Sequence, residues 1–264
     1  MENEIKAKAK DIKAIFFDID GTLVPINGKQ IPISARKSIE ALRAKGIKTI
    51  IATGRHSSEI KGLPVMDTKF DGYLTLNGSL DETMQAYAGT PIPKGDMEVL
   101  SQMFLVSKIP FIMIGEKKRY INFVNSTVVD VQSSTNGTIP DIDNYEGEDI
   151  YQIVAFIPPH QREILKSILD ECSITSWNEM GIDIIPKGAG KQVGITAYLE
   201  ANGLTPDNIM AFGDGENDIE MLKLAGIGVA MGNASDKVKA AADYVTDGVD
   251  VDGVEHALKH FGLI

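Results

Sequence analysis

The sequence contains one cysteine, Cys172, among its 264 residues. One cysteine cannot form an internal disulfide, so a reducing compartment, the cytoplasm, is expected. We expect the Cys172 side chain itself to be a small buried residue. No apolar run approaches the roughly 18 residues of a membrane-spanning helix, and the charged residues 1–13 do not resemble a secretory signal. The chain also lacks repeats and low-complexity tracts. These absences argue against a disulfide scaffold, a membrane span and a repeat architecture.

Positive charge is also scarce. The chain has 26 Lys and Arg against 37 Asp and Glu, which gives a net charge of −11. This balance disfavours nucleic acid and anionic membranes as partners. A small anionic ligand remains compatible, because a bound cation can invert the local field. The hydrophobic content of 43% is enough for the core of one large domain or of two moderate ones.

Apolar runs that end in turn residues alternate with helical patterns at both ends of the chain. Near the start, strands are predicted at 14–17, 47–52 and 73–76, and a helix at 34–45 with Ser34 as its N-cap. After Lys191, helices are predicted at 191–203, 219–225 and 235–242, and strands at 208–212, 228–231 and 243–246. This order predicts an α/β core, a Rossmann-like parallel sheet with helices on both faces.

The middle of the chain has a different pattern. Turn residues separate apolar runs at 111–114 and 120–124, and again at 174–177 and 182–185, as in hairpins. A strand is predicted at 151–157, with helices at 99–106 and 161–169. Hairpins combined with helices indicate an α+β domain with an antiparallel sheet. We therefore predict a core in two halves, 1–80 and 188–264, with an inserted domain at 81–187.

Two acidic residues, Asp18 and Asp20, directly follow the first predicted strand. If the strand continues, both side chains face the same way, and crowding two carboxylates costs electrostatic energy. A cation or a proton-transfer role would compensate. We interpret one Asp as a nucleophile and metal ligand and the other as an acid and base. An ordinary strand-ending turn remains the alternative.

A second acidic group, Asp214 and Asp218 with Asn217 between them, follows the strand predicted at 208–212. Ligands bind at the carboxyl ends of strands in parallel sheets, so these carboxylates should share a crevice with Asp18. Several carboxylates at one place require a cation, and hard oxygen ligands favour Mg²⁺.

Three residues provide groups suited to an anion. Thr53 and Gly54 follow the second predicted strand and offer a hydroxyl and backbone N–H groups. Lys191 follows a glycine-rich segment at a predicted helix start, where an ammonium can neutralise a transferring phosphoryl group. Taken singly, a lysine is more often a solvated surface residue, and Thr53–Gly54 is as readily an ordinary turn. These residues gain weight only from their place in the order of motifs.

Together these residues resemble the motifs of the haloacid dehalogenase superfamily, in the order of its phosphatase branch. The four motifs correspond to Asp18–Thr22, Thr53, Lys191 and Asp214–Asp218. Residues 52–55, 76–78 and 229–234 resemble the Cof-type subgroup, whose inserted α/β cap is of type IIB. The resemblance implies a phosphatase with the inserted domain as its cap. Asp20 supports this, because the dehalogenase branch has no acid at that position.

The resemblance also implies roles for single residues. Asp18 would attack phosphorus and form an aspartyl-phosphate, and Asp20 would protonate the leaving group and then activate water. Mg²⁺ would be held by Asp18, the backbone carbonyl of Asp20 and Asp214, with Asp218 orienting a metal-bound water.

The phosphoryl oxygens would be held by Thr53, Gly54, Lys191 and Asn217, and Lys191 would also tether Asp18. Specificity would depend on the cap, which closes over the crevice, and on Arg55, Asn77 and Gly78.

The expected partner is a small phosphorylated metabolite. Sugar phosphates, and hexose phosphates in particular, are the first candidates for the substrate. Two alternatives stay open: a sugar phosphomutase with the same intermediate, and a non-catalytic phospho-ligand binding protein. The sequence leaves the oligomeric state open.

Overall fold

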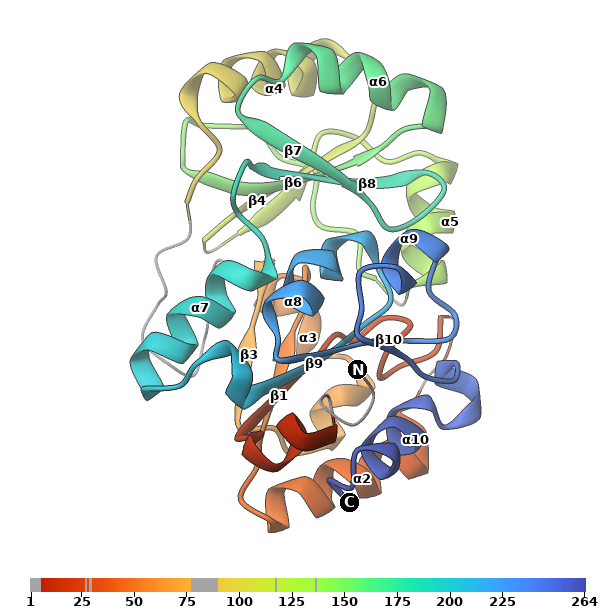
Figure 1. Ribbon diagram of the computed structural model, residues 1–264. Coiled ribbons are helices and arrows are strands. Elements are labelled where there is room, and N and C mark those ends of the chain that lie inside the picture. Colours follow the sequence, from red (N-terminus) through yellow and green to blue (C-terminus); the bar gives the residue numbers. More distant parts are fainter. Residues whose placement is uncertain (1–5, 27, 29, 77–89, 117, 136) are drawn as a thin grey trace. The chain divides into compact units, whose positions relative to one another are not determined.

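The computed structural model covers residues 1–264 and describes all of them except 1–5, 27, 29, 77–89, 117 and 136 (Figure 1). The chain forms two compact units, Met1–Tyr87 with Gly190–Ile264 and Ala88–Ala189. The predicted limits at 80/81 and 187/188 lie near these, and the first of them falls outside the described residues. No helix in the described part of the chain combines the length and the apolar character needed to cross a bilayer.

The first unit is built on a six-stranded parallel sheet in the order β11-β10-β9-β1-β2-β3. Its strands are β1 (Ala14–Phe17), β2 (Lys48–Ala52), β3 (Gly72–Leu74), β9 (Ile209–Gly213), β10 (Ile227–Ala230) and β11 (Tyr244–Val245). The chain continues from β1 to β2 on one side and places β9 on the other. The strand order therefore reverses beside β1, where open α/β sheets bind their ligands.

Helices cover both faces of this sheet, as predicted. They are α2 (Ile33–Ala44), α3 (Ser57–Ile60), α7 (Lys191–Asn202), α8 (Ile219–Leu224), α9 (Asp236–Lys239) and α10 (Gly253–His260). Alternate residues of β1 face opposite sides: Ile15 and Phe17 share a core with α2 and α10, and Ala14 and Phe16 share one with α7 and α8. Figure 1 shows these two helix layers. Short 3₁₀ helices occupy Ala9–Asp11, Pro64–Asp67, Pro206–Asn208, Glu216–Asp218 and Val249–Val251.

The second unit holds a five-stranded antiparallel sheet in the order β5-β4-β6-β8-β7. Its strands are β4 (Phe111–Gly115), β5 (Arg119–Ile121), β6 (Ile150–Phe156), β7 (Cys172–Ser176) and β8 (Gly181–Pro186), and its helices are α4 (Lys94–Val106), α5 (Ser126–Ser134) and α6 (Pro159–Ile168). Both predicted hairpins are confirmed. The core of this unit joins α4 and α6 to one face of the sheet, and Cys172 is buried within it.

Some local predictions were wrong. Ser34 is not an N-cap: α2 begins at Ile33 after Pro32, and the Ser34 hydroxyl instead donates a hydrogen bond to Asp252. Proline is well placed there, because it has no N–H to leave unpaired and its φ is fixed. The third strand ends at Leu74 rather than residue 76. By contrast, Gly203 ends α7 in the left-handed conformation, with φ 62°, as a C-terminal glycine should.

Candidate active site

Asp18 lies at the carboxyl end of β1, at the point where the strand order reverses. Its backbone N–H donates to the Phe212 carbonyl at 3.0 Å, which extends the pairing of β1 with β9. The chain then turns at Gly21, whose φ is +79°. A Cβ at Gly21 would lie 2.1 Å from Asp214 Oδ2. Only glycine therefore lets this turn approach Asp214 without a clash.

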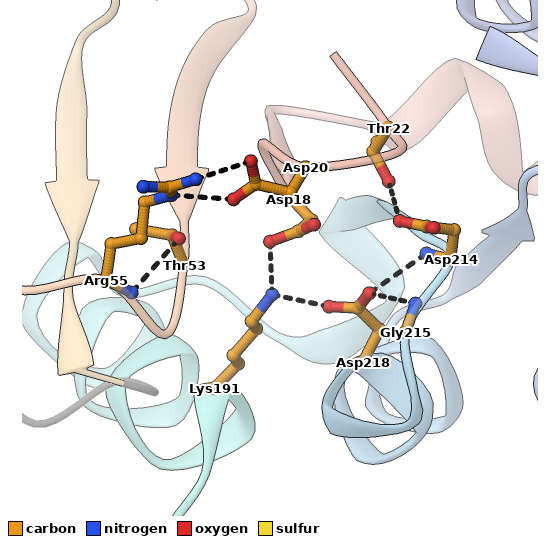
Figure 2. A network of polar contacts seen from close by, with 9 residues as sticks. All are labelled: Asp18, Asp20, Thr22, Thr53, Arg55, Lys191, Asp214, Gly215 and Asp218. Atoms are coloured by element: carbon orange, nitrogen blue, oxygen red, sulfur yellow. Dashed lines mark hydrogen bonds and ion pairs between the residues drawn. The ribbon is translucent and has the colours of Figure 1, made fainter. Parts of the chain in front are cut away.

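Lys191 joins the two acidic groups (Figure 2). Its Nζ lies 2.5 Å from Asp18 Oδ1 and 2.6 Å from Asp218 Oδ1, and its side chain is 0% exposed. Burial by itself would lower the pKa of this ammonium, but Asp18 and Asp218 outweigh it and raise the pKa. Lys191 is therefore held as a buried cation at the first residue of α7, between carboxylates that are distant in sequence.

Asp218 organises the loop that follows β9. Its Oδ2 accepts hydrogen bonds from the backbone N–H groups of Asp214 at 2.9 Å and Gly215 at 2.8 Å. Its Oδ1 binds Lys191, so both oxygens have donors within the protein. Asp218 is fully buried. The residue is placed to fix the loop and Lys191, rather than to offer an open oxygen to a ligand.

Asp214 receives one donor on each carboxylate oxygen. Thr22 Oγ1 donates to Oδ1 at 3.0 Å, and Asn233 Nδ2 donates to Oδ2 at 3.2 Å. The same Asn233 amide donates to the Gly21 carbonyl at 2.9 Å. No separate role was predicted for Thr22 or Asn233. The available signal was their position inside segments that resemble family motifs.

The acidic side chains are crowded. One carboxylate oxygen from each of Asp18, Asp214 and Asp218 lies within 4.8 Å of the other two. Burial raises the pKa of Asp18 to about 7, with Lys191 acting in the opposite direction, and raises that of Asp214 to about 8, with Asp18 adding to the shift. One ammonium thus does not compensate three carboxylates. Hard oxygen donors with excess negative charge fit a divalent cation held by Asp18 and Asp214.

Asp20 points to the other side of Asp18, toward Arg55 (Figure 2). Arg55 Nε donates to Asp20 Oδ2 and Arg55 Nη2 to Oδ1, each at 2.7 Å. Thr53, which is buried, accepts the Arg55 backbone N–H on its Oγ1 at 3.2 Å. The sequence singled out Arg55 as a substrate residue and missed its ion pair with Asp20, since no periodicity or spacing links positions 20 and 55.

Four further residues were predicted for this site. Gly54 and Asn217 are half-buried, and Asn217 lies in the 3₁₀ helix Glu216–Asp218. Asn77 and Gly78 lie outside the described residues. The structure thus brings together Asp18, Asp20, Thr53, Lys191, Asp214 and Asp218, which come from the ends of β1, β2 and β9 and the start of α7.

Residues 15–258 match the family model of the haloacid dehalogenase-like hydrolases. The chain belongs to this family. The match includes both halves of the parallel unit and the segment inserted between them. The relatives and solved structures described next identify it as a phosphatase.

The chain is 34% identical over 237 residues to the 5-amino-6-(5-phospho-D-ribitylamino)uracil phosphatase YcsE of Bacillus subtilis, covering 86% of this chain and 87% of that one. It is 31% identical over 272 residues to a Streptococcus pyogenes protein whose name combines a phosphatase with a peptidyl-prolyl cis-trans isomerase. That match covers 100% of this chain but only 57% of the longer relative. Among solved structures, a sugar phosphatase of haloacid dehalogenase subclass IIB superposes with a TM-score of 0.89 and 36% identity, covering 96% of this chain and 100% of that one.

Proposed function

We propose that the protein is a Mg²⁺-dependent hydrolase of small phosphomonoesters that works through a phosphoryl group on Asp18. The observation that carries this proposal is the buried Lys191, which holds Asp18 on one side and Asp218 on the other, next to Asp214. A buried cation bound to a strand-end carboxylate fixes that carboxylate in one orientation, as a nucleophile requires.

The first half-reaction transfers the phosphoryl group to Asp18. A bond forms between an Asp18 carboxylate oxygen and phosphorus while the bond between phosphorus and the ester oxygen breaks. Asp20 gives its proton to the departing oxygen. The carboxylates of Asp18 and Asp20 belong to one short segment at the end of β1, so a single turn presents both groups to the ester.

The second half-reaction removes the phosphoryl group. A water molecule attacks phosphorus and gives a proton to Asp20, and the bond between phosphorus and Asp18 breaks to release inorganic phosphate. The enzyme is returned to its starting state, because Asp20 recovers the proton that it gave to the leaving group.

Mg²⁺ would be held by Asp18, Asp214 and the Asp20 carbonyl, and it would supply positive charge beside the phosphoryl oxygens. Asp218 has both oxygens engaged by Lys191 and the loop backbone, which suits a supporting role. Thr53, Gly54, Lys191 and Asn217 are the proposed contacts of the phosphoryl oxygens. Because Thr53 Oγ1 accepts the Arg55 N–H, its own proton can point elsewhere.

We propose phosphorylated sugars and sugar alcohols as the substrate class, with hexose phosphates first. One solved neighbour is a sugar phosphatase, and the name of the relative YcsE specifies a phosphorylated ribityl chain. Both names describe a phosphate ester on a polyhydroxylated carbon chain. The proposal therefore extends a chemistry shared by two proteins that each align with most of this chain.

Phosphate release from a panel of sugar phosphates, nucleotides and phosphorylated cofactors tests this function. With Mg²⁺ the parent enzyme should release free phosphate, not an isomerised ester, and a chelator should stop it. Asp18→Asn should lower kcat by more than about a thousandfold, because the amide is a poor nucleophile. Asp130→Asn, which removes an exposed carboxylate from α5, is the matched control and should act like the parent. Comparable activity in Asp18→Asn and the parent would refute the proposal.

A further inference from the structure

Both carboxylate oxygens of Asp20 are held by one side chain. Arg55 Nε and Nη2 reach Oδ2 and Oδ1, respectively, at 2.7 Å each. The Arg55 side chain is 10% exposed and that of Asp20 is 37% exposed. The pair is a two-pronged contact on the solvent-accessible side of the site. A planar guanidinium in this arrangement fixes the plane of the carboxylate as well as its position.

Arg55 is itself anchored by its backbone to two neighbouring strand ends. Its N–H donates to Thr53 Oγ1 at 3.2 Å, just past β2. Its carbonyl accepts the N–H of Leu76 at 3.0 Å, just past β3. Leu76 is buried and has a φ of +48°, which a leucine rarely adopts. The base of the Arg55 side chain is therefore fixed independently of its contact with Asp20.

We infer that Arg55 is a positioning residue for Asp20: it holds the carboxyl that exchanges the proton in both half-reactions. This inference deepens the proposed function and rests on it. Arg55 follows β2 and Asp20 follows β1, and these two strands are neighbours in the sheet. The contact therefore connects two strand ends that each contribute residues to the site (Figure 2).

A two-pronged contact suits a group that must alternate between two forms. As a carboxylate, Asp20 accepts both Arg55 bonds and has further lone pairs for the proton of water. When one oxygen carries a proton, the other still accepts from the guanidinium, so the carboxyl stays in place. A lysine at position 55 offers a point charge without the planar fork, and it would hold the position but not the plane of the group.

Two esters with different leaving groups separate this role from direct binding of phosphate. A sugar phosphate expels a strongly basic alkoxide and needs the Asp20 proton, whereas p-nitrophenyl phosphate expels a weakly basic phenolate and does not. In Arg55→Lys and Arg55→Gln, kcat/KM for the sugar phosphate should fall at least about tenfold. With p-nitrophenyl phosphate, kcat/KM should change less than about threefold, while kcat falls because hydrolysis of the shared intermediate still needs Asp20.

Arg43→Lys is the matched control. Arg43 makes the same two-pronged contact with Asp71, Nε to Oδ2 at 3.0 Å and Nη2 to Oδ1 at 3.1 Å, but Asp71 precedes β3 at the opposite edge of the sheet. This variant should alter the thermal unfolding midpoint and leave the ratio of the two kcat/KM values unchanged. The comparison separates the loss of a guanidinium contact in general from its loss at Asp20.

Equal losses of kcat/KM on both esters in the Arg55 variants would overturn the inference, because they would place Arg55 on the phosphoryl group itself. Unchanged kinetics on both esters would overturn it as well. If the parent enzyme releases phosphate from neither ester, the proposed function fails, and this inference fails with it. The behaviour of the parent therefore distinguishes the two failures.

Discussion

Single residues at this site are explained by charge balance. Lys191 is fully buried, and its ammonium binds the carboxylates of both Asp18 and Asp218. Removing Lys191 would leave buried carboxylates without their cation, which is among the costliest changes that a protein interior can undergo. A lysine in this position is thus required by the electrostatics of the fold as well as by the proposed chemistry.

The raised pKa values of Asp18 and Asp214 predict how stability depends on pH. Burial raises the pKa of Asp18 from 3.8 to about 7 and that of Asp214 from 3.8 to about 8 in the folded chain. The metal-free folded state therefore binds more protons, and its free energy of unfolding should fall, by on the order of a few kcal/mol, as pH rises from about 4 to about 8.

Chemical denaturation across this pH range, with and without Mg²⁺, checks the prediction. Mg²⁺ should stabilise the protein most at the upper end of the range, where both carboxylates are ionised. Asp214→Asn should show a weaker pH dependence and a smaller effect of Mg²⁺. The assigned cation site would be contradicted if the free energy of unfolding of the metal-free parent rises with pH. It would also be contradicted if Mg²⁺ leaves the free energy of unfolding unchanged over the whole pH range.

At the scale of the elements, the site depends on the turns that follow β1 and β9. Gly21 brings the β1 turn against Asp214, and a Cβ at Gly213 would lie 2.5 Å from the Asp218 side chain. The donor atoms of Thr22 and Asn233 then hold Asp214 in place. Two strand ends are thereby locked together by backbone approach and not only by charged side chains.

Gly21→Ala should lower kcat/KM by at least about 100-fold, because the added methyl group displaces Asp214 from the site. Gly46→Ala is the matched control: Gly46 has a similar φ of +81°, but no atom lies within 4 Å of its added Cβ. It should lose about 1–2 kcal/mol of stability from backbone strain and keep its activity. Steady-state kinetics and thermal unfolding of both variants measure the difference, and similar kinetic losses in the two would refute the role given to the Gly21 turn.

The elements also show where sequence patterns suffice. Strand β1 was predicted to the residue, because its apolar run ends abruptly at Asp18. Helix α10 was missed although Val254, Ala257 and Leu258 have helical spacing and are buried. Helix α5 was missed because its valines and its threonine have low intrinsic helix propensity. Asn125 caps this helix by accepting the Val128 N–H at 3.1 Å.

At the scale of the whole molecule, the order of motifs along the chain predicted most of the site but not its contacts. Asp18 and Asp214 were expected together because parallel strands gather their carboxyl ends at one edge, and Lys191 was assigned to the same site by its place in the order of motifs. The contact between Arg55 and Asp20 was not expected, since it depends on side-chain directions that follow only from the packed sheet. The net charge of −11 is compatible with an anionic substrate because the proposed divalent cation would offset the excess of carboxylates over Lys191 and Arg55 at the site.

The central claim is that the phosphoryl group passes through Asp18, and a rapid acid quench during turnover of p-nitrophenyl phosphate tests it most directly. Asp20→Asn should slow hydrolysis of the intermediate more than its formation from this ester, so the intermediate should accumulate. Peptide mass spectrometry is then predicted to find one phosphoryl group on the peptide containing Asp18, and none when Asp18→Asn is added. A phosphoryl group on another residue, or phosphate release with no phosphorylated Asp18 at any time, would contradict the account.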